Sequence, residues 1–323
     1  MMDSIGILTS GGDAPGMNAA IRAIVRSSVR NKISVFGFKN GFDGLIESNY
    51  ECLTNRSVGN IIQKGGSILF TSRSKNFLKK NFRKKAYLQI VKLGVKNLII
   101  IGGDGTIKGG VIFSKEFNDI NVIALPATID KDVPSGLNTI GFDTAMNTAM
   151  EAIDKIRDTA TTSNIIHIIE VMGRDCGSLA ISSGLSGGAE AVIVPEKKTN
   201  IKILVDKIYQ QLSEGKKGCI LIIAEGALKN GARTLIHEMK VYRKLDIRVT
   251  TLGHVQRGGN PTAYDRILGS ELGYHAVKCL MDRKKNIVIS KTSNLIEEIK
   301  FSSLKPNEKS IDKNFIKLIN CLS

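Results

Sequence analysis

Residues 122–132 (VIALPATIDKD) constrain the fold more than any other segment of the chain. The segment begins with a short, fully apolar run, which is typical of a strand buried on both faces of a parallel sheet. The run breaks at Pro126, and the following loop carries Thr128, Asp130 and Asp132. Open α/β sheets bind ligands beyond the carboxyl ends of their strands. The sequence therefore places two carboxylates in a ligand crevice, although either one alone could instead cap a turn.

A second strand-and-loop unit, residues 97–106 (NLIIIGGDGT), precedes this segment. It brings Asp104 to the same predicted sheet edge in a glycine bend. Carboxylate oxygens are ligands that Mg²⁺ accepts beside phosphate groups. Acids at two neighbouring strand ends therefore indicate a metal-phosphate site with a base beside it.

Strand-like and helix-like segments alternate along the whole chain, which is the pattern of βαβ units in a doubly wound sheet. Strands are expected at 5–8, 34–38, 97–101, 165–171, 191–194, 219–224 and 249–252. Helices are expected at 17–30, 83–93, 144–157, 178–186 and 264–281. Two similar stretches, LTSGGDAPGMNAAI and IEVMGRDCGSLAIS, indicate related halves, whereas the tail from Ser290 carries no recognisable chemistry. We therefore predict an α/β protein with two Rossmann-like, doubly wound domains and mainly parallel sheets.

Composition narrows the class of protein. A chain of 323 residues is long enough for two domains, each with its own core. Its net charge of +16 suits nucleic acid or polyanionic metabolites, but many lysines lie in Lys/Asn/Ile-rich stretches that we interpret as solvated surface. Five cysteines without a C-x-x-C spacing and four scattered histidines give no zinc motif. With no leader and no long apolar run, we expect a cytoplasmic protein with no nucleic-acid or membrane partner.

Phosphate binding must use something other than a P-loop, because no G-x-x-x-x-G-K-[ST] motif occurs. Gly11 and Gly12 follow a strand and precede a helix, where bare backbone N–H groups and a positive helix end suit phosphate; a tight turn is the alternative. Arginines in strand-end loops suit bidentate phosphate recognition. The cationic candidates are Arg73, Arg174, Arg248, His254 and Arg257. Glu225 closes a strand and either accepts hydrogen bonds from sugar hydroxyls or caps a turn.

Five motifs together resemble those of the bacterial ATP-dependent 6-phosphofructokinases: TSGGDAPGMNAAIR, IGGDGT, TIDKD, EVMGRDCG and LGHVQRGG…YDR. They occur in that family's order across residues 9–266, although IGGDGT alone also marks NAD kinases and lipid kinases. The resemblance implies a phosphotransferase of glycolysis that uses ATP and Mg²⁺ to phosphorylate the 1-hydroxyl of fructose 6-phosphate. It also implies a cytoplasmic homotetramer that an ADP-type nucleotide regulates.

The resemblance further implies residue roles. Asp130 would be the base, with Thr128 and Arg174 as the other catalytic residues, and Asp104 would hold Mg²⁺. The residues implied to bind ATP are Gly12, Arg73, Ser74, Gly103, Asp104, Gly105 and Thr106. Those implied to bind the sugar phosphate are Thr128, Ile129, Asp130, Met172, Gly173, Arg174, Glu225, His254, Val255, Gln256 and Arg257, with Arg248 from a neighbouring subunit. Those implied to bind the effector are Arg22, Ala23, Ile24, Val25, Arg26, Arg157, Gly188, Ala189, Glu190, Lys216, Lys217 and Gly218.

The same resemblance divides the chain into domains. The ATP-binding domain would comprise residues 1–141 and about 256–306, and the sugar-phosphate domain 142–255 and about 307–323.

Several residues depart from the family pattern. Ile165 replaces an arginine that reaches the substrate of the neighbouring subunit, so affinity for fructose 6-phosphate or its cooperativity is expected to weaken. Asn55 and Glu214 replace basic residues, so effector control is expected to be reduced, and Lys131 between the two acids is expected to lower their pKa values.

The phosphoryl donor follows from two small residues. Pyrophosphate-dependent relatives carry Asp and Lys where this chain has Gly105 and Ala127, so ATP is favoured. The alternatives are a pyrophosphate-dependent or other GGDGT-type kinase, and a catalytically inactive nucleotide-binding regulator. The intact set of Asp104, Thr128, Asp130 and Arg174 argues against the regulator, because a protein that only binds has no use for a base.

Overall fold

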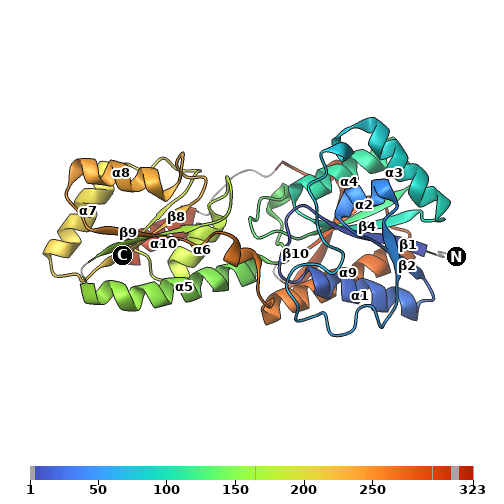
Figure 1. Ribbon diagram of the computed structural model, residues 1–323, viewed down its shortest axis with the longest axis horizontal. Coiled ribbons are helices and arrows are strands. Elements are labelled where there is room, and N and C mark those ends of the chain that lie inside the picture. Colours follow the sequence, from blue (N-terminus) through green and yellow to red (C-terminus); the bar gives the residue numbers. More distant parts are fainter. Residues whose placement is uncertain (1–3, 164, 293, 307–312, 323) are drawn as a thin grey trace. The chain divides into compact units, whose positions relative to one another are not determined.

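The computed structural model describes residues 4–163, 165–292, 294–306 and 313–322, which divide into two compact units (Figure 1). Unit 1 takes its described residues from Met1–Ile129, Val133–Thr144 and Arg257–Glu308. Unit 2 takes its described residues from Asp130–Asp132, Ala145–Gln256 and Lys309–Ser323. The TIDKD segment is therefore divided, because Thr128 and Ile129 belong to unit 1 and Asp130 to unit 2.

Unit 1 is built on a seven-stranded sheet with the order β11-β10-β5-β4-β1-β2-β3. The strands from β10 to β2 run parallel, and the two edge strands β3 and β11 are antiparallel to their neighbours. The strands are β1 (Ser4–Ser10), β2 (Ser34–Phe38), β3 (Tyr50–Leu53), β4 (Asn97–Gly102), β5 (Asn121–Pro126), β10 (Ile287–Thr292) and β11 (Leu295–Lys300). The helices are α1 (Met17–Arg30), α2 (Gly41–Glu47), α3 (Lys80–Lys92), α4 (Asp104–Glu116) and α9 (Ala263–Met281).

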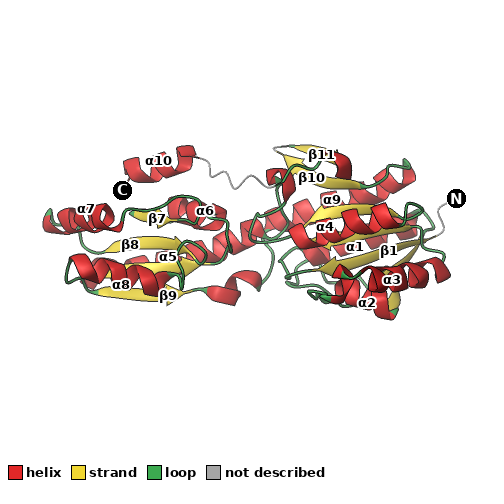
Figure 2. Ribbon diagram, turned by 90° about the horizontal axis from the view of Figure 1, so that it is seen from above, coloured by secondary structure: helices red, strands yellow, loops and turns green. Residues whose placement is uncertain are grey.

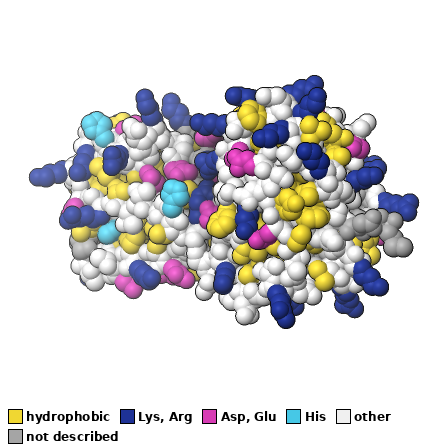
Figure 3. Space-filling view, turned by 45° about the vertical axis from the view of Figure 1, so that its right-hand side comes forward, with side chains coloured by type: hydrophobic (Ala, Val, Ile, Leu, Met, Phe, Trp, Pro, Cys, Tyr) yellow, Lys and Arg dark blue, Asp and Glu magenta, His cyan; other side chains and the backbone are white. Residues whose placement is uncertain are grey.

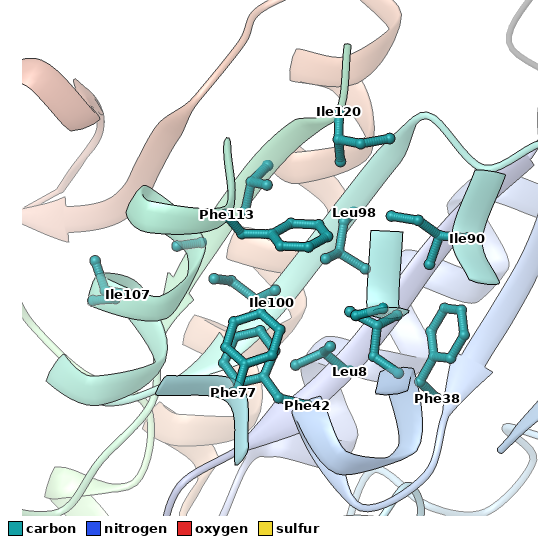
Figure 4. Packing of buried hydrophobic residues seen from close by; sticks show 14 of the residues in the cluster. Leu8, Phe38, Phe42, Phe77, Ile90, Leu98, Ile100, Ile107, Phe113 and Ile120 are labelled. Carbon is teal, nitrogen blue, oxygen red and sulfur yellow. The ribbon is translucent and has the colours of Figure 1, made fainter. Parts of the chain in front are cut away.

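One apolar cluster of unit 1 fills the space between this sheet and the helices α2, α3 and α4, while α1 and α9 cover the opposite face (Figure 1). All six residues of β5 are buried, as predicted for a strand covered on both faces. In Figure 4 the rings of Phe42 and Phe77 stack at 3.9 Å beside Phe113. Each such ring contributes roughly 1.5–3 kcal/mol by leaving water.

Unit 2 has a four-stranded, fully parallel sheet with the order β7-β8-β6-β9. The strands are β6 (Ile166–Val171), β7 (Ala191–Ile193), β8 (Cys219–Ala224) and β9 (Ile247–Thr251), and helices flank both faces (Figure 2). The helices are α5 (Phe142–Ser163), which begins in unit 1, α6 (Ser178–Ser186), α7 (Ile201–Ser213), α8 (Ala232–Tyr242) and α10 (Lys313–Leu322). One apolar cluster lies under α7 and α8, and a second lies under α5, α6 and α10.

The predicted fold class is confirmed, since both sheets are doubly wound and mainly parallel. The helices at 17–30 and 178–186 and the strands at 34–38 and 219–224 begin and end where they were expected. The expected glycine bend lies at Gly103, directly before Asp104, but the helix α4 that begins at Asp104 was not predicted. Its first residues, DGTIKGG, have low helix propensity, and burial of Ile107 and Phe113 outweighs that preference.

Charged side chains share the surface with exposed hydrophobic ones such as Leu78, Ile203 and Val241. Lysine and arginine side chains are scattered over the face in Figure 3, in line with the interpretation of this charge as solvated surface. Among the described helices, none combines the length and the apolar character needed to cross a membrane.

Candidate active-site elements

The strand order of unit 1 reverses between β1 and β4, because β2 lies on one side of β1 while β4 and β5 lie on the other. Doubly wound sheets bind ligands at the carboxyl ends of the strands where the order reverses. The loops at that position carry the Gly11–Gly12 pair after β1 and the Gly103–Thr106 segment after β4. The fold therefore places both predicted glycine loops at its topological switch point.

Hydrogen bonds hold these two loops together. The Thr106 hydroxyl donates to the Ser10 carbonyl at 2.9 Å, and the Gly11 N–H donates to the Ser72 carbonyl at 2.9 Å. The hydroxyls of Ser72 and Ser74 both donate to the Asp43 carboxylate. Asp43 thus fixes the two residues that flank the exposed Arg73. No sequence motif distinguishes Asp43, so it was not among the predicted site residues.

Asp104 occupies the first turn of α4, where the positive end of the helix dipole favours negative charge. Its side chain is 28% exposed and forms an ion pair with Lys108 at 2.6 Å. A Cβ atom on Gly103 would lie 3.4 Å from the Cβ of Thr128, so the loop after β5 packs against the loop after β4. The structure therefore packs Thr128 against Gly103, the residue directly before Asp104, in unit 1.

Gly12 has a second partner in the same unit. A Cβ atom at this position would lie 2.4 Å from Nη1 of Arg257, which also donates to the Asp13 carbonyl at 3.2 Å. Arg257 is buried. The absent side chain at Gly12 thus makes room for a buried guanidinium, and Arg257 lies beside the loop predicted to hold phosphate.

Unit 2 contains the carboxylate pair of the TIDKD loop. The Asp130 side chain is 2% exposed, and its Oδ2 atom lies 3.3 Å from Nε of Arg174. Nη1 of the same guanidinium lies 3.9 Å from Oδ2 of Asp132. Arg174 has a left-handed backbone with φ of 52°, and its side chain is half exposed. One arginine therefore contacts both predicted acids and still reaches solvent.

The loops after β6, β8 and β9 support this arginine. Glu225 after β8 accepts a hydrogen bond from the Arg174 N–H at 2.9 Å. A Cβ atom on Gly226 would lie 2.0 Å from the Arg174 carbonyl, so only glycine allows this approach. Gln256 accepts from the Met172 N–H at 2.9 Å and is fully buried. These loops follow the carboxyl ends of the strands, at the point where the strand order of unit 2 reverses between β6 and β9.

Among the other predicted substrate residues, three are exposed and two directly precede Asp130 or Arg174. The Arg248 side chain on β9 is 64% exposed, and its pair with Asp246 at 3.8 Å contributes little in water. His254 and Val255 are also exposed. Ile129 is buried in unit 1, and Gly173 adopts a left-handed φ of 135° directly before Arg174.

Part of the predicted effector set gathers in unit 2. The buried Glu190 carboxylate lies 3.1 Å from Nζ of Lys216 and 3.6 Å from Nη1 of Arg157. Arg157 also donates to the carbonyls of Gly187 and Gly188, at 2.7 and 2.6 Å. An anionic ligand for these two cations would therefore compete with Glu190. The residues from Arg22 to Arg26 lie on α1 of unit 1 instead.

Comparison with known proteins agrees with the class of doubly wound α/β proteins that these sheets define. Residues 4–280 match the family model described as Phosphofructokinase. The chain is 46% identical over 323 residues to the ATP-dependent 6-phosphofructokinase of Staphylococcus carnosus, with 100% of both chains covered. It is also 46% identical over 322 residues to the enzyme of that name from Thermoanaerobacter pseudethanolicus, again with 100% of both covered.

Solved structures give the same result. Pichia pastoris phosphofructokinase matches with a TM-score of 0.87 and 30% identity, covering 99% of this chain and 37% of that chain. The pyrophosphate-dependent phosphofructokinase from Marinobacter aquaeolei matches with a TM-score of 0.82 over 98% of this chain and 91% of that one, but its 19% identity supports the fold alone. The chain belongs to the phosphofructokinase family, as its motifs predicted.

Proposed function

We propose that this chain transfers the γ-phosphoryl group of ATP to the 1-hydroxyl of fructose 6-phosphate in the cytoplasm. Membership of the family and full-length relatives named ATP-dependent 6-phosphofructokinase support this reaction. The observation that carries the proposal is the contact between the buried Asp130 and Arg174. In this reading unit 1 binds ATP and unit 2 binds the sugar phosphate.

Asp130 is proposed to take the proton from the attacking hydroxyl. A carboxylate can do this only while it is ionised, and the Arg174 guanidinium at 3.3 Å stabilises that charge in a buried position. Arg174 also has N–H groups suited to the oxygens of a phosphoryl group. Transfer of this kind depends mainly on positioning and on electrostatic stabilisation of a loose transition state.

The other residues proposed to bind ATP lie at or beside the switch point of unit 1. Backbone N–H groups of Gly12, Gly103 and the first residues of α4 lie at the switch point of unit 1. The exposed Arg73 follows Ser72, whose carbonyl accepts from the Gly11 N–H. Asp104 fits Mg²⁺, because its accessible carboxylate lies at a helix end that attracts phosphate. When bound, Mg²⁺ neutralises charge that develops on the phosphate oxygens.

ATP is proposed as the donor in preference to pyrophosphate. A Cβ atom on Gly105 would meet no atom within 4 Å, so this position leaves open space. An aspartate at this point would fill part of that space and add negative charge beside the donor phosphates. The neutral Ala127 is buried at the end of β5 and leaves the donor region without a further charge.

A coupled assay tests the proposal directly. We would measure product formation from fructose 6-phosphate with ATP and with pyrophosphate, and ATP turnover with other sugar phosphates and with NAD as acceptors. The proposal expects turnover with ATP and fructose 6-phosphate that exceeds every other combination. Faster turnover with pyrophosphate, or with NAD as acceptor, would replace it with the corresponding alternative kinase. No turnover with any pair would favour the inactive regulator, and a mobility shift with DNA would then test nucleic-acid binding.

We also propose a homotetramer in which Ile165 weakens affinity for fructose 6-phosphate or its cooperativity. Ile165 directly precedes β6, next to the strand that carries the exposed Arg248. An Ile165→Arg variant should shift the saturation curve for fructose 6-phosphate to lower concentration; an unchanged curve would count against this role.

The contacts of Glu190 with Arg157 and Lys216 support an effector site whose ligand must displace an internal carboxylate. ADP titration into the enzyme measures that response.

A further inference from the structure

Three metal-binding side chains meet at one edge of unit 1, away from the switch point. His275 and Cys279 lie four residues apart on α9, so they share one face of the helix. Glu298 lies on the edge strand β11, in the tail that no predicted function used. One ligand atom from each residue lies within 4.8 Å of the other two.

The contacts within this cluster are already polar. Nε2 of His275 lies 2.7 Å from Oε1 of Glu298, and the Lys284 ammonium donates to Oε2 of the same carboxylate. The Cys279 sulfur lies within 4.8 Å of the nearest ligand atoms of His275 and Glu298. Cys279 is 1% exposed, whereas His275 and Glu298 are only partly buried. The cluster therefore has a closed side at the thiol and an open side at the other two groups.

We propose that His275, Cys279 and Glu298 form a binding site for a thiophilic divalent cation of the Zn²⁺ type. Imidazole nitrogen, thiolate sulfur and carboxylate oxygen are the ligands that Zn²⁺ takes, whereas Mg²⁺ and Ca²⁺ avoid sulfur. Three protein ligands leave a fourth tetrahedral position for water. Proteins bind Zn²⁺ with ligand distances of about 2.0–2.3 Å, so the three ligand atoms must lie about 3.5 Å apart. Nε2 of His275 and Oε1 of Glu298, now 2.7 Å apart, must therefore separate to admit the cation.

Binding must displace two groups. Cys279 is buried beside Glu298 and must give up its thiol proton before its sulfur can bind a cation. The cation takes the place of the thiol proton, which leaves to solvent, and sulfur becomes a thiolate ligand. Lys284 competes for the carboxylate, because its ammonium already pairs with Glu298. Asp282 is the other charged group that acts on this thiol.

The cation would join α9 to the hairpin of β10 and β11. Helix α9 packs along α1, and β10 pairs with β5, so these elements form the side of the sheet that ends at β11. A ligand that binds only the folded state stabilises it in proportion to its concentration and affinity. The site would therefore bind the cation for stability, at a distance in the fold from the loops after β1 and β4.

Cobalt spectroscopy tests the proposal without reference to activity. The metal-free, full-length protein would be titrated with Co²⁺, and the cobalt–thiolate charge-transfer absorption would be followed and then reversed with Zn²⁺. We expect one equivalent to bind in the wild type and the absorption to disappear in Cys279→Ser. Cys219→Ser is the matched control, because Cys219 is also 1% exposed but lies in unit 2. It should bind like the wild type.

Three further variants keep the test decisive if Cys279→Ser fails to fold. His275→Ala and Glu298→Gln should each weaken Zn²⁺ binding by at least about 100-fold, because even the loss of an outer-shell partner costs 10–100-fold. Lys284→Gln removes the competitor and should tighten binding about two- to fivefold. No thiolate absorption in the wild type, absorption that survives Cys279→Ser, or unchanged binding in both ligand variants would overturn the site.

Discussion

Asp104 in unit 1 and Asp130 in unit 2 follow neighbouring parallel strands, yet their surroundings differ. Asp104 begins a helix, is 28% exposed and pairs with Lys108, whose side chain is 68% exposed. Asp130 is 2% exposed and pairs with Arg174, whose backbone N–H is itself held by Glu225. The first carboxylate can exchange its partner for a cation from solvent. The second is held in one geometry by a supported arginine.

Two identical side chains thereby gain separate chemistry from their environments. Environments that differ in burial and in partner charge are how one fold assigns different roles to similar groups. The accessible carboxylate suits the proposed Mg²⁺, and the buried one suits the proposed base. Replacement of either carboxylate, of its partner, or of a reference ion pair elsewhere in the fold should separate these two roles.

Replacement of Asp130 should have the largest effect. Asp130→Asn keeps the shape and removes the proton acceptor, so turnover should fall by about 10²–10⁴-fold, or roughly 3–5 kcal/mol of barrier. The KM for fructose 6-phosphate should change little, because Arg174 remains in place. Initial rates with saturating ATP measure both quantities. Near-normal turnover would remove Asp130 from the role of base.

Replacement of Asp104 should come second. Asp104→Asn removes a charged ligand of the proposed Mg²⁺. The KM for ATP–Mg²⁺ should therefore rise by about 10–100-fold, since mutation of even a residue that only supports a metal ligand lowers metal affinity by this factor. Raised Mg²⁺ concentration should restore part of the loss in this variant but none in Asp130→Asn. Equal rescue of both variants by Mg²⁺ would show that the two carboxylates do not differ in role.

Arg174→Lys tests the partner of the buried carboxylate. Lysine keeps the charge but loses the planar fork, and hydrogen bonds to charged groups contribute about 1.5–3 kcal/mol. Turnover should therefore fall by about tenfold or more.

Glu225→Gln should give a smaller loss, because a neutral amide oxygen still accepts from the Arg174 N–H. A larger loss in Glu225→Gln would mean that Glu225 contacts substrate itself.

Much of this arrangement was predictable from local sequence. The apolar run before Pro126 specified β5, and strand–glycine–helix patterns specified the loops at both switch points. The contact between Asp130 and Arg174 was not predictable, because Asp130 follows β5 and Arg174 follows β6, and these strands belong to different sheets. The role of Glu225 as a support for the Arg174 backbone depends on the strand order of unit 2. Helix α4 was missed because its glycines disfavour a helix that only tertiary packing stabilises.

The ion pair of Arg83 and Glu116 provides a reference that lies outside the candidate site. The hydrogen bond from Arg83 lowers the pKa of Glu116 below its ordinary 4.5. Such a carboxylate stabilises the fold above pH 4.5, and this contribution disappears as pH falls through the lower folded-state pKa. Glu116→Gln should thus reduce the free energy of unfolding by about 2 kcal/mol at neutral pH, and the difference from wild type should shrink below pH 4.5.

Urea unfolding of both proteins at several pH values measures this difference. The matched control is Glu51→Gln, because the Lys39–Glu51 pair at 2.9 Å is more exposed and should contribute less than about 1 kcal/mol. Unlike Asp130→Asn, Glu116→Gln should leave turnover unchanged at neutral pH. A loss of turnover in Glu116→Gln with unaltered stability would contradict the assignment of this pair to the fold.

Lys108→Gln should have the smallest effect and tests the exchangeable partner of Asp104. An exposed pair of this kind contributes about 0.2–1 kcal/mol, so its removal should change the Mg²⁺ requirement by no more than about fivefold. The direction is informative, because Lys108 and the cation compete for one carboxylate and the variant should need less Mg²⁺. The activation curve of Mg²⁺ at fixed ATP gives the shift. A higher requirement would mean that Lys108 helps to bind the triphosphate, so that Asp104 would be held by a functional partner much as Asp130 is.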